Sequence, residues 1–357
     1  MLRAAVVGAG GYAGIEAVRI LLAHPEFEVT CAVSDANEGL RLADVYPALA
    51  GSTELVYSKL NYADVADKCD VVFLAVPHTA AMPCAPFFLE RGIAVIDLSA
   101  DFRIHDPLVY EKWYDVAHAS RELLQKAVYG QPETHREDLK YLHEAWAADH
   151  MKNAPLVACA GCYPTATILA AVPALEAGLV MDGPLVVNAM SGVSGAGKKL
   201  APRNHFCSAH DSVQAYSAGK HRHAPEIAQE LTIAAGYDQQ VIFTPHLVPM
   251  KRGLLSTVTL PLRSNIDYDA VLSAYAERYN NEPFVHFLGE SMPQTASVIG
   301  GNHAQVGVSY DEYNQAAIVS CAIDNLDKGA ASQGVQCANI VCGFEEDLGL
   351  LFPHPVV

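Results

Sequence analysis

Cys162 is the residue whose surroundings in this sequence best suit covalent chemistry. The apolar run 155–158 predicts a short buried strand, and Gly161 permits a sharp turn after it. Pro164 suits the first turn of a helix, which we expect over residues 165–177. The cysteine would then lie at a helix N-terminus, where unpaired amide groups and the helix dipole favour the nucleophilic thiolate. The pattern indicates a catalytic cysteine.

Two other interpretations of this cysteine stay open on the residues alone. Most cysteines outside disulfides are small buried hydrophobic residues. Cys159 and Cys162 also have the Cys-x-x-Cys spacing of redox and metal pairs. A thioredoxin-like pair is expected nearer to the N-terminus, and no second pair completes a zinc site. We therefore expect no metal centre.

A second group of reactive side chains, His221, His223 and Glu226, precedes and opens a predicted helix. Histidine titrates near neutrality, so one imidazole is a candidate general acid or base. We expect Glu226 to orient that ring and to raise its basicity. Histidines two residues apart point in different directions, which argues against a shared metal ion. Solvated surface histidines are the alternative, and the residues do not decide between His221 and His223.

A glycine-rich turn after the apolar run 2–7 predicts a dinucleotide-binding site. We expect a helix from about residue 12 to 24 and a second strand over 29–33, so the turn opens a strand–helix–strand unit. Glycines let the backbone approach a pyrophosphate, and the helix N-terminus supplies amides for it. A tight turn in another kind of α/β protein is the alternative. The candidate cofactor residues here are Gly8, Gly10, Gly11, Tyr12, Ala13 and Gly14.

The residues after the second strand leave NAD and NADP undecided. Asp35 suits a free ribose 2'-hydroxyl, whereas Ser34 with Arg41 nearby suits a 2'-phosphate. Pro77 and His78 follow a later strand, where a nucleotide or nicotinamide would lie, although a solvated loop is an equal alternative.

Two further groups are candidates for binding anions. Arg103 follows another strand and could clamp a carboxylate or phosphate, or form a surface salt bridge. A glycine-serine loop after the strand-like run 184–189 also carries lysines and lacks the Walker A spacing. We assign Ser194 and Gly195 of this loop to cofactor binding, and Ser191 and Lys198, together with Arg103 and His223, to substrate binding.

Positioning these residues requires two domains. Strand-like runs at 55–57, 71–76 and 94–98, with a helix over 79–91, follow the alternation of a Rossmann-type, doubly wound parallel α/β sheet. The second domain has strands that alternate apolar and polar residues, which predicts an α+β domain with a largely antiparallel sheet. Its expected elements are strands at 241–245, 254–262, 284–287, 305–310 and 316–323 and a helix over 267–279.

We expect the domain boundaries to follow the chemistry. Residues 1–161 would bind NADP, completed by a C-terminal helix at 326–357 whose amphipathic part is 326–342, and residues 162–325 would carry catalysis and oligomerisation. The pattern over 137–150 predicts a solvent-exposed helix that carries no catalytic or binding residue.

Composition restricts the class of protein. The chain has 357 residues, 51% of them hydrophobic, and a formal net charge of −17. That charge argues against nucleic acid and anionic membranes as partners. Nine scattered cysteines suit reduced thiols in the cytoplasm. We expect no signal peptide and no membrane span.

Ordered motifs along almost the whole chain resemble the N-acetyl-gamma-glutamyl-phosphate reductases of arginine biosynthesis. The resemblance implies that Cys162 is the nucleophile, His221 the acid/base and Glu226 its orienting partner. It also implies NADP as cofactor, an anionic acyl-phosphate substrate, phosphate as co-product, and a homodimer or homotetramer. The motifs are residues 8–14, 97–103, 161–166, 191–197, 221–226 and 244–253.

The resemblance predicts a reaction and leaves rivals to it. Cys162 would displace phosphate to form a thioester, and hydride transfer would then give N-acetylglutamate semialdehyde. The same chemistry on aspartyl phosphate or a carrier-linked aminoadipyl phosphate is the nearest rival, although motif 221–226 favours the glutamyl enzyme. An inactive nucleotide-binding scaffold is the other. Gly10 departs from the serine or threonine common in the family, and Asp35 does not suit NADP.

Overall fold

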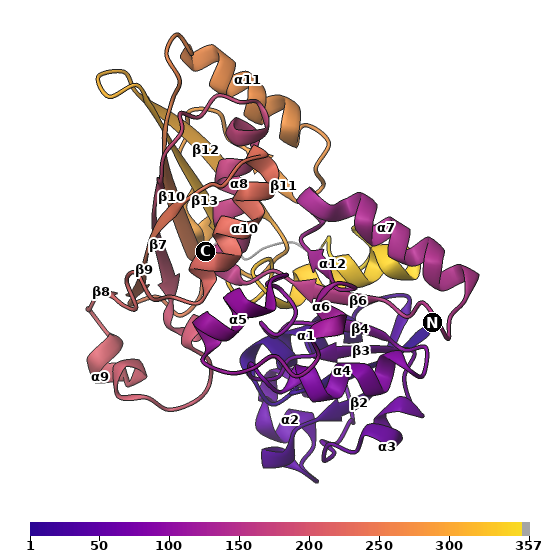
Figure 1. Cartoon of the computed structure of the whole chain (residues 1–357). Coiled ribbons are helices and arrows are strands. Elements are labelled where there is room, and N and C mark those ends of the chain that lie inside the picture. Colours follow the sequence, from indigo (N-terminus) through magenta and orange to yellow (C-terminus); the bar gives the residue numbers. More distant parts are fainter. Residues whose placement is uncertain (352–357) are drawn as a thin grey trace. The chain divides into compact units, whose positions relative to one another are not determined.

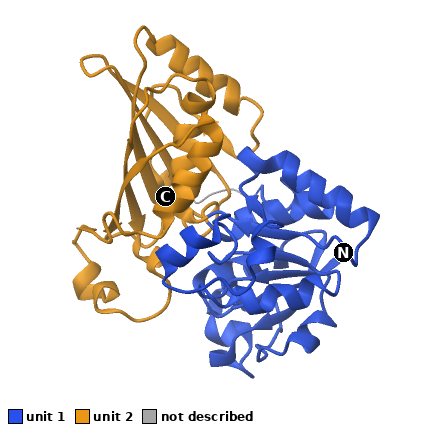
Figure 2. Ribbon diagram, viewed as in Figure 1, with its two compact units in different colours: residues 1–160, 330–352 blue, residues 161–329, 353–357 orange. Residues whose placement is uncertain are grey.

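The chain forms two compact units, which we describe separately. The computed structural model describes residues 1–351. Of the described residues, the first unit comprises Met1–Ala160 and 330–351, and the second comprises Gly161–Gly329 (Figure 2). Residues 352–357 of the C-terminal helix predicted over 326–357 lie outside the described part of the chain.

The first unit is built on a six-stranded sheet in which every described pairing is parallel (Figure 1). The strand order β2-β1-β3-β4-β6-β5 confirms the doubly wound prediction. The strands are β1 (Leu2–Val7), β2 (Phe27–Val33), β3 (Val71–Leu74), β4 (Ala94–Asp97), β5 (Val128–Gly130) and β6 (Leu156–Cys159). The prediction of a strand at 55–57 was wrong, because this segment forms only an isolated bridge between Val56 and Arg41.

Helices cover this sheet. They are α1 (Tyr12–Leu22), α2 (Leu42–Val45), α3 (Tyr62–Ala66), α4 (Ala81–Leu89), α5 (Pro107–Tyr114), α6 (Arg121–Leu124), α7 (Pro132–Ala148) and α12 (Ala331–Cys342). Alternate strand residues such as Val7, Leu74 and Val95 share one apolar core with α3 and α4. On another part of the sheet, a Cβ at Gly334 of α12 would lie 2.7 Å from Leu98, so this helix packs closely.

Two helix predictions in this unit need correction. The helix expected from Leu326 begins only at Ala331, because the preceding residues form turns that bond to Asp324. The helix expected over 137–150 is α7, which starts at Pro132 and packs against α12. Its Trp146 is buried, so this helix is not simply a solvated excursion.

The second unit is built on a seven-stranded mixed sheet with the order β11-β12-β13-β10-β7-β9-β8. Within residues 161–329, four strand pairs are antiparallel and two, β11–β12 and β7–β9, are parallel. The strands are β7 (Leu185–Gly192), β8 (Gln214–Ala215), β9 (Val241–Val248), β10 (Leu254–Pro261), β11 (Val285–Phe287), β12 (Ala304–Asp311) and β13 (Ala316–Ile323).

Helices lie against one face of this sheet (Figure 1). They are α8 (Cys162–Glu176), α10 (His223–Ala235) and α11 (Tyr268–Tyr279). The short helix α9 (Phe206–Ala209) packs instead against the turn Pro202–Asn204. Residues 163–175 of α8 are all buried, which explains why this helix is apolar all round. Within residues 1–351 we find no helix with both the length and the apolar character needed to cross a bilayer.

Asp101 fixes the loop between β3 and α4. Its fully buried carboxylate accepts hydrogen bonds from the amides of Thr79, Ala81 and Met82 at 2.6, 2.9 and 3.3 Å. The Tyr110 hydroxyl donates to it at 2.9 Å. Thr79 has a φ of 75°, a left-handed conformation that a non-glycine residue adopts only when its surroundings hold it.

We expect Asp101→Ala to lower the free energy of unfolding by about 3 kcal/mol or more, because it leaves buried donors without an acceptor. Asp106→Ala is the matched control, since Asp106 is exposed and caps α5 through one bond to the Leu108 amide at 2.8 Å. Its loss should be about 1 kcal/mol. Urea unfolding followed by circular dichroism measures both, and equal losses would contradict this role for Asp101.

Candidate active site

Cys162 is the first residue of α8 and follows β6 after a two-residue turn, as predicted. Gly161 is the N-cap of this helix, with φ −73° and ψ 160°. Cys162 is partly exposed, whereas Cys159 is fully buried. The thiol therefore lies at the positive end of a helix dipole and within reach of a ligand, where the thiolate form is favoured.

The turn in front of the cysteine is tied to helix α10. The Gly161 amide donates to Oε1 of Glu226 at 2.9 Å, and Glu226 is fully buried in the first turn of α10. This contact was not expected from the sequence, and it fixes the backbone that carries Cys162. The expected role of Glu226 in orienting a histidine ring stays a prediction.

Tyr163, on the other side of the cysteine, links it to the histidines. The Tyr163 ring lies 5.6 Å from that of His221 and 6.0 Å from that of His223, between ring centroids. Its hydroxyl donates to the His246 carbonyl at 3.0 Å, and the Tyr216 hydroxyl donates to it at 3.2 Å. Burial raises the pKa of both tyrosines, that of Tyr216 to about 12, so they act as neutral donors. The structure thus brings the segment 161–163 and the histidine pair together.

His221 is held in one tautomer. The His223 amide donates to Nδ1 of His221 at 3.2 Å, so Nδ1 is an acceptor and Nε2 carries the hydrogen. The pKa of His221 is lowered to about 3, mainly because the ring is buried among Tyr163, Tyr216 and Phe243. The charges of His223 and Arg222 also lower it, and each has a larger effect than the opposing charge of Glu226. The expectation of a ring with raised basicity was therefore wrong, because desolvation outweighs the carboxylate.

The glycine-serine loop follows β7 and is anchored on the segment 250–253. The amides of Val193 and Ser194 donate to the carbonyls of Met250 and Lys251. Ser191 is buried, and a Cβ at Gly195 would lie 2.7 Å from its hydroxyl. Lys198 is exposed. The substrate roles of Ser191, Lys198 and His223 and the cofactor roles of Ser194 and Gly195 stay predictions.

The first unit contains a cradle that matches the glycine turn predicted for a dinucleotide. A Cβ at Gly8, where φ is +90°, would lie 2.2 Å from the Ala75 carbonyl oxygen, and one at Gly14 would lie 2.3 Å from the Gly8 oxygen. Gly11 caps α1, which begins at Tyr12 and Ala13. These clashes require glycine at both positions, whereas a Cβ at Gly11 would meet only the Gly8 oxygen, at 3.5 Å. The tight turn and the partly exposed N-terminus of α1 fit a pyrophosphate.

The residues proposed to read the ribose lie beside this turn or near it. A Cβ at Gly10 would lie 2.4 Å from the Ser34 hydroxyl, so the two positions are in contact. Asp35 accepts a hydrogen bond from the Leu60 amide at 3.0 Å. Arg41 is exposed and pairs with Asp44 at 3.0 Å and with Glu54. Exposed ion pairs exchange partners at little cost, so Arg41 remains able to bind a phosphate.

Pro77 and His78 follow β3 and lie at the carboxyl edge of the sheet. The Ala75 amide donates to the Val7 carbonyl at 2.8 Å, which places this loop next to the glycine turn where the strand order reverses. Such a position binds nucleotides in open α/β sheets. Both residues are exposed.

Arg103 is largely buried, and its role in binding substrate stays a prediction. It is 7% exposed, and its guanidinium donates to the carbonyls of Cys159 at 2.7 Å and Leu98 at 3.0 Å. Beside it, burial raises the pKa of Asp97 to about 7, and the nearby Asp101 adds to that effect. Arg103 thus stabilises the carboxyl ends of β4 and β6.

Sequence reasoning missed several residues that shape these sites. Asp101, Tyr163, Tyr216, Asn325 and Gly329 act through contacts between distant segments, which no local spacing reveals. Gly329 has the clearest signal in the structure, since its Cβ would lie 2.7 Å from that of Cys162.

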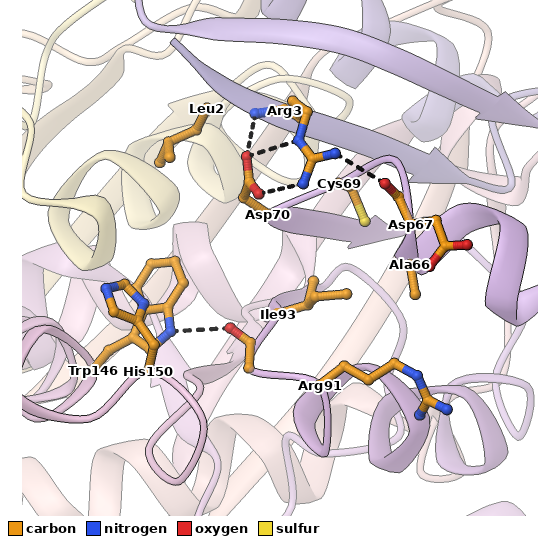
Figure 3. Close-up of a pocket in the computed structure, with 11 residues that line it drawn as sticks. Leu2, Arg3, Ala66, Asp67, Cys69, Asp70, Arg91, Ile93, Trp146 and His150 are labelled. Carbon is orange, nitrogen blue, oxygen red and sulfur yellow. Dashed lines mark hydrogen bonds and ion pairs between the residues drawn. The ribbon is translucent and has the colours of Figure 1, made fainter.

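A cavity of about 520 Å³ lies elsewhere in the first unit (Figure 3). Leu2, Asp70 and Ile93 place it at the amino ends of β1, β3 and β4, the edge opposite to the glycine turn. Arg3 and Asp70 form an ion pair at its rim. The residues lining it include none of those predicted to bind cofactor or substrate.

Two family models cover most of the chain. Residues 3–142 match the semialdehyde dehydrogenase NAD binding domain, and residues 162–325 match the semialdehyde dehydrogenase dimerisation domain. Among solved structures, aspartate semialdehyde dehydrogenase with NADP from Candida albicans aligns with a TM-score of 0.70 at 17% identity, over 96% of this chain and 98% of that one. Aspartate semialdehyde dehydrogenase II from Vibrio cholerae aligns over the same shares with a TM-score of 0.69. These structures show the shared fold.

Relatives with closer sequences are similar over almost their whole length. The N-acetyl-gamma-glutamyl-phosphate reductase of Geobacter metallireducens is 45% identical, over 99% of this chain and 100% of that protein. The reductase of the same name from Desulforudis audaxviator is 44% identical over 99% of both chains. The chain therefore belongs to the N-acetyl-gamma-glutamyl-phosphate reductase family.

Proposed function

We propose that this protein catalyses the NADPH-dependent reductive dephosphorylation of N-acetyl-gamma-glutamyl phosphate to N-acetylglutamate semialdehyde, a step of arginine biosynthesis. The observation that carries the proposal is the position of Cys162 at the first residue of α8, with both neighbouring residues tied to the histidine-bearing region. Family membership supports the substrate.

Cys162 acts as the nucleophile. Its thiolate attacks the acyl carbon and forms a carbon–sulfur bond. The bond between the acyl carbon and the oxygen that bridges to phosphorus breaks, and phosphate leaves with that electron pair. The resulting thioester has lost the resonance of a carboxylate, so its carbon accepts hydride. The nicotinamide supplies that hydride when bound. Collapse of the hemithioacetal breaks the carbon–sulfur bond, returns the thiolate and gives the aldehyde.

His221 serves as a hydrogen-bond donor to the reacting oxygen. Its neutral ring presents Nε2–H, because Nδ1 accepts the His223 amide. A fixed donor stabilises the negative charge that develops on the acyl oxygen at each tetrahedral stage. Glu226 supports the arrangement by anchoring Gly161.

The first unit is the proposed NADP-binding domain. The tight turn from Gly8 to Gly14, followed by the N-terminus of α1, would hold the pyrophosphate, and Pro77 with His78 lies beside it. Ser34 with Arg41 supports NADP over NAD, since Asp35 already accepts the Leu60 amide. In the second unit we assign Ser194 and Gly195 to the cofactor and Ser191, Lys198 and His223 to the substrate. We also assign Arg103 to the substrate, and its bond to the Cys159 carbonyl holds it in place.

The second unit is the proposed catalytic and oligomerisation domain of a cytoplasmic homodimer or homotetramer. Its match to a dimerisation domain supports assembly. The outward face of β7 and β9 also carries exposed apolar side chains, Val186, Met190 and Ile242.

The function is tested by phosphate-dependent reduction of NADP with N-acetylglutamate semialdehyde, assayed beside aspartate semialdehyde and with NAD in parallel. We expect turnover of the first aldehyde and a higher kcat/KM with NADP. Preference for aspartate semialdehyde would favour the aspartyl enzyme, and preference for NAD would mean that Asp35 reads the ribose. Failure to turn over either aldehyde would favour the inactive scaffold.

Cys162→Ser should bind NADPH as the parent does and lose almost all turnover, because a serine hydroxyl is a poor nucleophile without a strong base. Cys159→Ala is the matched control, since that cysteine is buried, and it should stay active. NADPH titration and the aldehyde assay measure these effects. If both variants are inactive and the resting protein contains a disulfide between them, the redox pair is the correct interpretation.

His221→Asn should lower kcat by about 10²-fold to 10⁴-fold. Because the pKa of His221 is lowered to about 3, the ring is protonated only below that pH and stays neutral between pH 5 and 8. The pH dependence of kcat/KM in this window should therefore be the same in variant and parent. His223→Asn, the control, should act mainly on KM. If kcat/KM of the parent changes between pH 6 and 7 and that change is absent in His221→Asn, then His221 titrates in this range and is not a neutral donor.

A further inference from the structure

The cavity at the amino ends of β1, β3 and β4 has the size and the mixed lining of a ligand site (Figure 3). Its volume of about 520 Å³ lies in the range of small-molecule sites. Burial raises the pKa of Cys69 to about 12, so its thiol is neutral and adds to the apolar part of the wall. That part includes the buried side chains of Ala66, Cys69, Ile93 and Trp146.

Trp146 is held in place before any ligand binds. Its indole Nε1 donates to the Gly92 carbonyl at 3.1 Å, and the His150 ring packs edge-on against the indole, with ring centroids 4.8 Å apart. A Cβ at Gly92, where φ is +73°, would lie 2.9 Å from the His150 carbonyl oxygen, so the two segments pack closely. The aromatic side of the cavity is therefore rigid, which reduces the entropy lost on binding.

Arg3 and Asp70 satisfy each other at the rim of the cavity. Nη2 and Nε of Arg3 donate to the two Asp70 oxygens at 2.7 and 3.3 Å, and Nη1 donates to the Asp67 carbonyl at 2.9 Å. The Arg3 amide donates to the same Asp70 carboxylate at 2.9 Å. This pair closes one wall without leaving a charge for a ligand to neutralise.

Asp67 and Arg91 also line the cavity, and their opposite charges are not paired with each other. Within residues 1–351, the Asp67 carboxylate has neither a hydrogen-bond donor nor a cation as partner, and Arg91 has no acidic partner. Arg91 is oriented by Phe87 instead. The guanidinium carbon lies 3.5 Å from the Phe87 ring centroid, and Nη1 donates to the Phe87 carbonyl at 3.0 Å.

These two charged groups lie on the opposite side of the cavity from Trp146 in Figure 3. Both are exposed, so a ligand can reach them from solvent. A ligand with an ammonium group and a carboxylate close together would pair with both Asp67 and Arg91 through charge-assisted hydrogen bonds. Its apolar body would then lie against Ile93 and Trp146. A ligand with only one charge would leave the other group unpaired.

We propose that this cavity binds a free α-amino acid with an aromatic or large apolar side chain, whose ammonium group contacts Asp67 and whose carboxylate contacts Arg91. The proposal is independent of the function proposed above, because none of the residues that line the cavity takes part in it.

The test is titration of the whole protein with L-phenylalanine, followed by the fluorescence of Trp146. The chain has two tryptophans, so a Trp113→Phe background leaves Trp146 as the reporter. We expect a saturable change at concentrations up to about 10 mM. The analogues 2-phenylethylamine, which lacks the carboxylate, and 3-phenylpropionate, which lacks the ammonium group, should each bind about 10-fold more weakly, the effect of one charged hydrogen bond.

Two variants assign each charge to its partner. Asp67→Asn should weaken binding of phenylalanine about 10-fold and leave 3-phenylpropionate unchanged, because that analogue has no ammonium group to lose. Arg91→Gln should weaken phenylalanine similarly and leave 2-phenylethylamine unchanged. Asp64→Asn is the matched control, since Asp64 is exposed in α3 outside the cavity. If Arg91→Gln does not fold, Asp67→Asn with 3-phenylpropionate decides the outcome.

Four results would overturn the inference. They are no saturable change with phenylalanine, binding of either analogue as tight as that of phenylalanine, equal effects of Asp67→Asn and Asp64→Asn, and displacement of phenylalanine by saturating NADPH. The last result would place the amino acid at the nucleotide site. Failure of the aldehyde assay would disprove the proposed function and leave this binding test decisive.

Discussion

The hydrogen bond from the Gly161 amide to the buried carboxylate of Glu226 is the contact on which the site depends. Gly161 caps α8, so this bond sets where the helix and its first residue, Cys162, begin. Glu226 belongs to the first turn of α10, directly after the histidines. One bond therefore fixes the nucleophile relative to His221. A buried polar group is costly unless it is hydrogen-bonded, so loss of this bond would destabilise the folded protein.

The same device recurs at two other loops. Asp101 accepts the amides at the start of α4 and thereby holds the segment with Pro77 and His78, and Asp324 accepts the amides of Gly300 and Leu326. In each case a fully buried carboxylate satisfies backbone donors from a segment without regular structure. The loops thought to contact ligands are thus rigid before binding, which reduces the entropy lost when a ligand binds.

Sequence reasoning predicted the features that depend on neighbouring residues. The strand, turn and helix around Cys162 and the turn at Gly8 follow from apolar runs, glycines and helical spacing, and the structure contains both. Sequence reasoning failed where the property of a residue depends on segments that are distant in the sequence. The low pKa of His221 comes from rings that other elements bring around it, and the bonds of Arg103 need the end of β6. The strand expected at 55–57 satisfies the local pattern but finds only a bridge to Arg41.

The first unit is made from two stretches of chain, because α12 returns to it after the whole of the second unit has intervened. During synthesis the sheet therefore emerges from the ribosome without the helix that packs on Leu98 through Gly334. Until Ala331–Cys342 has been made, that apolar surface stays open to solvent and to other nascent chains. The first unit therefore begins first on the ribosome but is completed last. We expect the second unit to become compact before α12 docks on the first.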